Sequence, residues 1–188
     1  MIENIKSKET QKNTCALKDL FTTKALARAG IIAALYAALT YVFGPIAYGP
    51  LQVRPAEALC VLPLFFIEAV PGLFVGCALA NIISGYLIYD IVFGSLVTLA
   101  AAILTYITGR LLQGKFLSVV LGGIPPVLLN AVFIPLIIIL VGSGETFAAY
   151  PLYFGQFMLT QSVWVYALGI PLYFAVKKLR AKGVKALL

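Results

Sequence analysis

Histidine is absent from this sequence, and acidic side chains are scarce. The 188 residues include seven Asp and Glu against fourteen Lys and Arg, and charged residues make up only 11% of the chain. Histidine is the commonest general base and metal ligand near neutral pH. No Cys/His cluster, Ser–His pairing or acidic pair at helical spacing within an apolar run takes its place. We therefore expect a protein that is not an enzyme and that holds no metal or cofactor.

Cysteine is also rare, and the three examples are Cys15, Cys60 and Cys77. Their number is odd and the last two lie in apolar runs, so a disulfide framework is not expected. We expect small buried side chains instead.

Polar surface is what the composition lacks most. Hydrophobic residues make up 62% of the chain and the mean hydropathy is +1.01, which leaves too few polar residues to cover a water-soluble domain of this size. Lipid is therefore the expected solvent. A membrane-spanning helix needs about 20 apolar residues, so the stretch 24–177 has room for roughly five to seven spans in one bundle.

We predict an all-α membrane protein with six transmembrane helices in a compact bundle. The expected spans are 26–43, a short second span and a third that share the stretch 56–88, and then 90–108, 116–141 and 150–176. A tight turn at 68–72, where Pro71 and Gly72 fall together, is predicted to divide the stretch 56–88. The second span has only about 12 residues, so a re-entrant segment is the alternative for it.

The cations are distributed unevenly along this path. Cytoplasmic segments of membrane proteins retain Lys and Arg, and with six spans thirteen of the fourteen cations fall on one side and only Arg54 on the other. We predict a multi-pass protein of the cell membrane with both termini in the cytoplasm, and nucleic-acid binding is not needed to explain the charge. Residues 1–23 lack the apolar core of a signal peptide. We expect them to form a cytoplasmic tail, 24–178 the transmembrane domain and 179–188 a basic cytoplasmic tail.

The first predicted span carries a ladder of alanines four residues apart: Ala25, Ala29, Ala33 and Ala37. Small residues at this spacing form a flat face on which another backbone can approach closely. Two roles fit this face, packing against another helix of the same bundle and docking of a separate membrane protein. The spacing alone favours the first.

Polar residues gather toward the predicted outer half of the bundle. Charges near the hydrocarbon cost about 3 kcal/mol on insertion scales and usually face a cavity or a partner, and Glu57 and Asp90 fall at outer ends of spans. At about 1.5 Å per helical residue, Asn130 and Gln161 reach similar depths. The candidate substrate-binding residues are Tyr48, Gln52, Arg54, Glu57, Asn81, Asp90, Asn130, Gln156, Gln161 and Trp164.

Amides, carboxylates and aromatic planes around one pocket suit a flat heterocycle that carries amide and amino groups. Other roles stay open for several members of the set. Tyr48 and Trp164 also fit as interfacial or packing aromatics. Asp90 also fits as a helix N-cap, and Arg54 as the ion-pair partner of Glu57.

Several ordered motifs resemble those of one family of membrane proteins. They are the alanine ladder, YGPLQVRPAEAL at 48–59, PGLFVGC at 71–77, DIVFG at 90–94 and PPVLLN at 125–130. Together they resemble the queuosine-precursor transporter (QueT) family, whose members are substrate-binding S components of energy-coupling factor (ECF) transporters. The resemblance covers nearly the whole chain after residue 23.

The resemblance implies a six-helix S component that captures a 7-deazaguanine precursor outside the cell. A transmembrane T protein, docked on the alanine ladder, and two ATP-binding-cassette (ABC) ATPases would supply the energy. Glu57 or Asp90 would accept the paired N–H groups of the aminopyrimidinone edge, and Asn130, Gln156 and Gln161 would bind its carbonyl and ring nitrogens. The alternatives are an S component for another vitamin, such as riboflavin or thiamine, and a self-sufficient small channel or secondary carrier.

Overall fold

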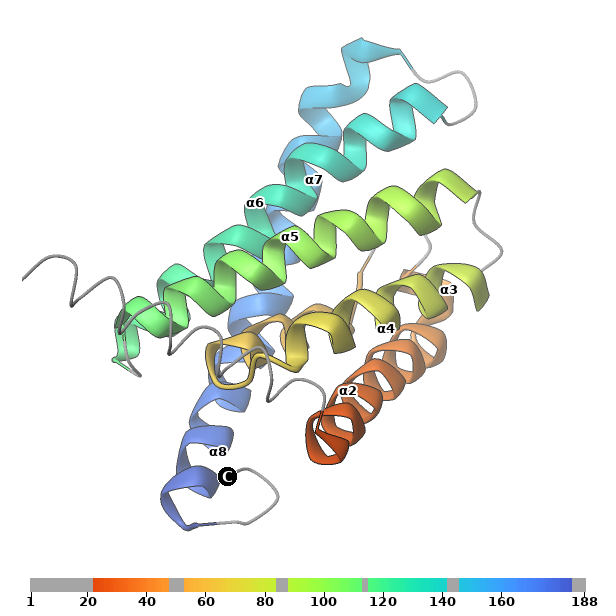
Figure 1. Cartoon of the computed structure of the whole chain (residues 1–188). Helices are drawn as coiled ribbons and strands as arrows, with labels where there is room; N and C mark the ends of the chain where they lie inside the picture. Colours follow the sequence, from red (N-terminus) through yellow and green to blue (C-terminus); the bar gives the residue numbers. More distant parts are fainter. Residues whose placement is uncertain (1–21, 48–52, 84–87, 113–114, 142–145, 184–188) are drawn as a thin grey trace, which may run out of the picture.

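The computed structural model describes residues 22–47, 53–83, 88–112, 115–141 and 146–183, and every regular element in these ranges is a helix (Figure 1). The predicted all-α class is confirmed for this part of the chain. In chain order the elements are α2 (Thr23–Val42), α3 (Gly44–Ala47), the 3-10 helix η1 (Pro55–Leu64), α4 (Ala69–Ile83), α5 (Ile88–Leu112), α6 (Phe116–Val141), the 3-10 turn η2 (Phe147–Ala149), α7 (Tyr150–Ser162), the π-helical segment η3 (Val163–Leu168) and α8 (Gly169–Ala181).

The long helices pack on one another around a central element. α2 packs on α4, α4 on α5, α5 on α6 and α6 on α7 (Figure 1). η1 lies within this arrangement, in contact with α2, α5, α6 and the η3–α8 segment. The residues of η1 from Pro55 to Pro63 are all buried. A polar side chain on η1 therefore faces either protein or a cavity.

Among the described residues, four helical segments are long and apolar enough to cross a membrane: Thr23–Val42, Ile88–Leu112, Phe116–Leu140 and Phe147–Ala181. η1, with 10 residues, and α4, with 15, are apolar but shorter. At about 2.0 Å per 3-10 residue and about 1.5 Å per α-helical residue, each is roughly 20 Å long, against a hydrocarbon core of about 30 Å. The predicted six spans are thus supported for four segments, and the two shorter helices remain a prediction as spans.

The outward surfaces of the long helices are apolar. Ile103, Leu104 and Ile107 of α5 and Leu117 and Leu128 of α6 are each 43–50% exposed. Contiguous apolar surface of this kind is rare on a soluble monomer. It indicates contact with lipid.

The predicted turn at 68–72 is wrong in position. The chain leaves η1 at Leu64 and α4 already begins at Ala69, so Pro71 and Gly72 lie in its first turn. Proline is tolerated there because the first N–H groups of a helix have no intrahelical acceptor. The Gly72 N–H donates to Glu68 O at 3.2 Å and so already belongs to the helix.

Glycines in the surrounding helices allow η1 to lie at the centre. The fourth span was predicted to end at Thr108, but α5 continues through Gly109 to Leu112. A Cβ at Gly109 would stand 2.7 Å from Leu64 O, and one at Gly169 in α8 would stand 2.8 Å from Val61 Cγ1. Gly109 is therefore a contact point with η1 and not a helix end.

The last predicted span, 150–176, is longer and less regular than expected. It continues to Ala181, and η3 interrupts it with a π-helical turn. Pro171, in the first turn of α8, has no N–H to donate to the preceding turn, and a π-type turn is a known accommodation of such breaks. From η3, the Tyr166 hydroxyl donates to Val120 O of α6 at 2.9 Å, which fixes this turn against the bundle.

The alanine ladder of α2 packs on α4 in the structure. Ala25, Ala33 and Ala37 are at most 8% exposed. A Cβ at Gly72 of α4 would stand 2.8 Å from Ala29 O, and one at Gly76 would stand 2.9 Å from Ala33 O. The ladder is therefore covered by α4. The small residues of α2 that remain exposed are Ala27, Gly30, Ala34 and Ala38.

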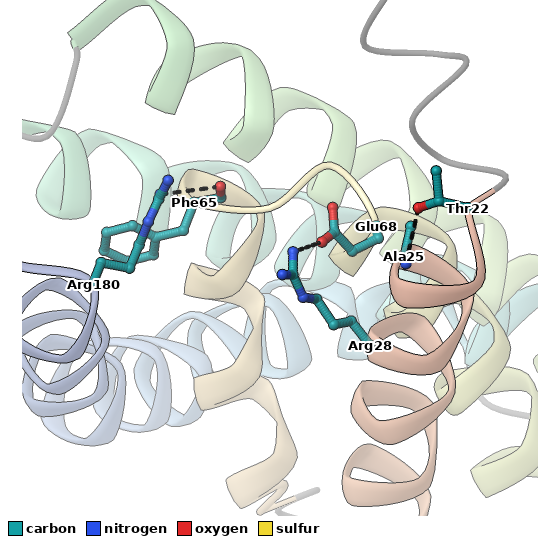
Figure 2. Close-up of polar contacts among 6 residues, drawn as sticks. All are labelled: Thr22, Ala25, Arg28, Phe65, Glu68 and Arg180. Atoms are coloured by element: carbon teal, nitrogen blue, oxygen red, sulfur yellow. Dashed lines mark hydrogen bonds and ion pairs between the residues drawn. The ribbon is translucent and has the colours of Figure 1, made fainter. Parts of the chain in front are cut away.

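The end of the bundle where α2 begins is held by charged contacts. Arg28 of α2 forms an ion pair with Glu68, just before α4, with 2.7 Å between Nη1 and Oε1 (Figure 2). From α8, Arg180 Nη1 donates to Phe65 O at 3.4 Å (Figure 2). The Arg180 guanidinium also lies 5.5 Å from the centre of the Phe66 ring. These contacts connect α2, the turn between η1 and α4, and α8.

Cations collect at this same end. It includes the start of α2, the end of α5, the start of α6 and the end of α8. The Tyr173 hydroxyl of α8 donates to Lys115 O, just before α6, at 3.2 Å. Within the described ranges Arg54 alone lies elsewhere, and the others are Lys24, Arg28, Arg110, Lys115, Lys177, Lys178, Arg180 and Lys182.

Candidate functional site

A pocket opens at the opposite end of the bundle, where η1 begins, α4 ends and α5 begins. The space between its lining residues is about 430 Å³ when open solvent is included, and the volume open to the centres of water-sized molecules is about 20 Å³. The lining combines charged, amide and apolar side chains: Arg54, Glu57, Cys77, Asn81, Asp90, Gly94, Thr98, Asn130, Ile134, Phe157 and Gln161.

Glu57 is the centre of a buried hydrogen-bond cluster in this pocket. The side chain is only 2% exposed. The Tyr36 hydroxyl donates to Oε1 at 2.7 Å. Cys60 Sγ and Asn130 Nδ2 donate to Oε2 at 3.2 and 3.3 Å. A carboxylate away from water is stable only when it is hydrogen-bonded or paired, and these donors satisfy that requirement.

The donors reach Glu57 from different elements. In a 3-10 helix, residues three apart lie almost directly above one another, which brings Cys60 of η1 against Glu57. Tyr36 lies on the inward face of α2 with no exposed surface, and Asn130 lies on the inward face of α6. Pro55 occupies the first turn of η1, where it needs no N–H acceptor, and Glu57 in the same turn is favoured by the helix dipole.

A second polar group is built where α4 ends and α5 begins. Asn81 Nδ2 donates to the backbone O of Asp90 at 3.1 Å. Gly94 leaves room for this amide, since a Cβ there would stand 3.2 Å from Asn81 Nδ2. Thr98 donates to Gly94 O at 3.0 Å and lies 3.4 Å from Cys77 Sγ. These contacts hold the half-buried Asp90 in the first turn of α5, beside the pocket.

α7 supplies a wall with an apolar and a polar part. Phe157 and Gln161 lie one turn apart and are 2% and 3% exposed, and Ile134 of α6 extends the apolar part. Gln161 Oε1 is buried and has no hydrogen-bond partner among the described residues. An unpaired buried acceptor costs about 1–3 kcal/mol. A bound molecule that donates to this oxygen would remove that cost.

The structure brings six of the predicted binding residues into the pocket: Arg54, Glu57, Asn81, Asp90, Asn130 and Gln161. Gln156 and Trp164 are half-buried on the last span but are not part of the lining. The predictions for Tyr48 and Gln52 lie outside the described residues. α5 already begins at Ile88, so Asp90 lies inside its first turn and not at the N-cap position that the alternative predicted, and it lines the pocket.

Sequence reasoning missed part of the site. The residues concerned are Tyr36, Cys60, Cys77, Thr98, Ile134 and Phe157. The sequence contains features that could have identified two of them, Tyr36 and Phe157. Tyr36 carries the one hydroxyl in the segment 33–38, which otherwise holds only Ala and Leu, and Phe157 lies four residues before Gln161. The others look like ordinary core residues in the sequence.

A helical bundle with lipid-facing apolar helices and a polar pocket at one end is the architecture of an integral membrane protein with a candidate small-molecule site. The chain belongs to the QueT transporter family, whose family model matches residues 26–178. It is therefore a multi-pass membrane transporter, and the family suspected from the motifs is confirmed. No curated protein and no solved structure matches the chain.

Proposed function

We propose that this protein is the substrate-binding S component of an ECF-type ABC importer and that its substrate is a queuosine precursor of the 7-deazaguanine class. The observation that carries the proposal is the polar pocket at one end of the bundle, in a chain of the QueT transporter family. The family name gives the class of substrate, and the lining gives the chemistry by which it is bound.

A 7-deazaguanine fits this lining. Its flat bicyclic ring matches the apolar wall that includes Phe157, and aromatic rings favour stacked or edge contacts. Its aminopyrimidinone edge presents several N–H donors to the oxygens of Asp90 and Gln161, while the Arg54 guanidinium is a donor for its carbonyl.

The proposed orientation follows from the charge. The described cations other than Arg54 lie at the end of the bundle where α2 begins, and the pocket lies at the other end. Since cytoplasmic segments retain Lys and Arg, the pocket opens to the outside and both termini lie in the cytoplasm. Substrate is thus captured from the extracellular side.

Energy for transport comes, in this proposal, from a T protein and two ABC ATPases. The T protein docks on α2, but on the face that α4 does not cover, which carries Ala27, Gly30, Ala34 and Ala38. A Cβ at Gly30 would meet no atom within 4 Å, so this face is open to a second backbone. Small residues at such spacing favour close helix contact in membranes.

Reconstitution tests the proposal. In proteoliposomes, labelled 7-deazaguanine is expected to accumulate only when the T protein, the ATPases and ATP are all present. Excess unlabelled 7-deazaguanine is expected to compete for uptake, and riboflavin and thiamine are not. Transport by the protein alone would establish a self-sufficient carrier or channel, and competition by riboflavin or thiamine would establish a different S component.

A further inference from the structure

Two amides in the pocket are fixed in orientation by their partners. Asn130 Nδ2 lies 3.3 Å from Glu57 Oε2, and Asn81 Nδ2 lies 3.1 Å from the backbone O of Asp90. An ionised carboxylate and a carbonyl can only accept hydrogen bonds. Both amides therefore direct one N–H at the protein, and Asn130 keeps its oxygen, Oδ1, and its second N–H for a ligand.

Two other side chains of the pocket, Gln161 and Asp90, add hydrogen-bond acceptors. Gln161 Oε1 is buried in the wall without a hydrogen-bond partner among the described residues. The Asp90 carboxylate interacts electrostatically with Arg54 and shows no hydrogen bond within the described part of the chain, whereas Glu57 already accepts from three side chains. Asp90 is thus the carboxylate whose oxygens are available to a ligand, and Glu57 is a positioning residue for Asn130.

The charges in the lining do not cancel. Arg54 contributes one positive charge, and Glu57 and Asp90 contribute two negative charges. The formal sum with both carboxylates ionised is minus one. Unbalanced charge is costly once a bound ligand has displaced water, and a ligand with one positive charge makes the occupied pocket neutral. A neutral ligand leaves the imbalance, and an anion increases it.

We infer that the pocket selects a cationic ligand rich in N–H donors, and that Asp90 pairs with its ammonium group. The inference rests on the proposed function, within which it distinguishes between 7-deazaguanines by their C7 substituent. An aminomethyl substituent is protonated near neutral pH and donates to Asp90, Asn130 Oδ1 or Gln161 Oε1. A nitrile is neutral and offers only an acceptor, and a carboxylate is an anion.

Competition binding to the purified full-length protein tests this inference. The displacing ligands are 7-aminomethyl-, 7-cyano- and 7-carboxy-7-deazaguanine, each measured against labelled 7-deazaguanine. Because a hydrogen bond to a charged partner strengthens binding by about tenfold or more, the aminomethyl form is expected to bind at least about tenfold more tightly than the nitrile. The carboxy form is expected to bind most weakly.

Variants identify the residue responsible. Asp90→Asn keeps the size of the side chain and removes its charge, so the preference for aminomethyl over nitrile is expected to fall to about onefold. Asp90→Glu, which restores the charge, is expected to recover part of the preference. Glu68→Gln is the matched control, because it removes a carboxylate at the far end of the bundle and leaves the preference unchanged.

The outcomes separate this inference from the proposed function. Equal or tighter binding of the nitrile or carboxy form to the wild-type protein, or an unchanged preference in Asp90→Asn, overturns the inference while the proposed function stands. If no 7-deazaguanine binds, the proposed function fails and the inference fails with it. Should Asp90→Asn not fold, the ranking of the three ligands on the wild-type protein still decides.

Discussion

The hydroxyl of Tyr36 makes the shortest of the three contacts to Glu57, at 2.7 Å between two buried side chains. Tyr36→Phe keeps the ring and removes this donor. Since a hydrogen bond to a charged group contributes about 1.5–3 kcal/mol, we expect a clear fall in the apparent Tm of the detergent-purified protein. Tyr41→Phe is the control, because Tyr41 is on the same helix and is 65% exposed. Equal melting temperatures for the two variants would contradict the role given to Tyr36.

The buried Gln161 Oε1 has no hydrogen-bond partner among the described residues, which destabilises the empty protein. A ligand that donates to this oxygen would remove the destabilisation. Replacing Gln161 with Met keeps its length and removes the unpaired Oε1. We expect Gln161→Met to melt at a higher temperature than the wild type without ligand, because about 1–3 kcal/mol of unmet hydrogen bonding is removed. We expect it also to bind 7-deazaguanine more weakly. A variant that is less stable and binds normally would show that Gln161 serves only the packing.

Individual polar residues could be selected from the sequence, but not their partners. Glu57, Asn130 and Gln161 were selected because amides and carboxylates are costly in apolar spans. The contacts that organise them join positions 21 and 73 residues apart. Such contacts depend on how the helices cross, and spacing within one helix does not contain that information.

The crossing of α2 and α4 depends on glycines that leave no space for a side chain. A Cβ at Gly76 would stand 2.8 Å from Tyr36 Cβ and 2.9 Å from Ala33 O. Gly76→Ala is therefore expected to push the helices apart and to destabilise the protein by about 1–3 kcal/mol, despite the better helix propensity of alanine. Thermal unfolding in detergent measures this.

Gly30→Ala is the matched control for that prediction. Gly30 lies in α2, where an added Cβ would meet nothing within 4 Å. It is expected to keep or raise the apparent Tm, because alanine is favoured over glycine by about 1 kcal/mol in a helix. A Gly76→Ala variant as stable as Gly30→Ala would mean that the two helices are not in the close contact described.

The bounds of a regular helix could be predicted from the sequence, whereas the irregular elements could not. The fifth span was predicted at 116–141 and is observed as α6 with the same bounds, although it contains three prolines. η1 was expected only as a short, doubtful span, because a ten-residue 3-10 helix is uncommon and depends on helices packed around it. The turn at 68–72 was misplaced because Pro71 and Gly72 also fit the first turn of a helix.

On the scale of the whole molecule, the pocket end, the cation-rich end and the exposed face of α2 have separate proposed roles. Ala34→Trp places a large side chain on the exposed face of α2. We expect it to abolish ATP-dependent uptake by blocking the T protein, and to leave the affinity for 7-deazaguanine within about twofold of the wild type, since the pocket lies elsewhere.

Leu104→Trp is the control for this uptake assay. Leu104 is 44% exposed on α5, away from α2, so uptake is expected to continue. Normal uptake by Ala34→Trp would place the docking face on another helix. Loss of uptake in both variants would mean that the assay responds to bulk in the membrane and not to one docking face.

In the proposed function this chain alone holds the substrate, in the pocket around Glu57, Asp90 and Gln161. The most direct measurement is a calorimetric titration of 7-deazaguanine, without a C7 substituent, into the purified protein with no partner present. We expect saturable binding of about one ligand per chain that is strongly weakened by Gln161→Met and not by Glu68→Gln. No saturable binding, or binding that both variants leave unchanged, would contradict this expectation.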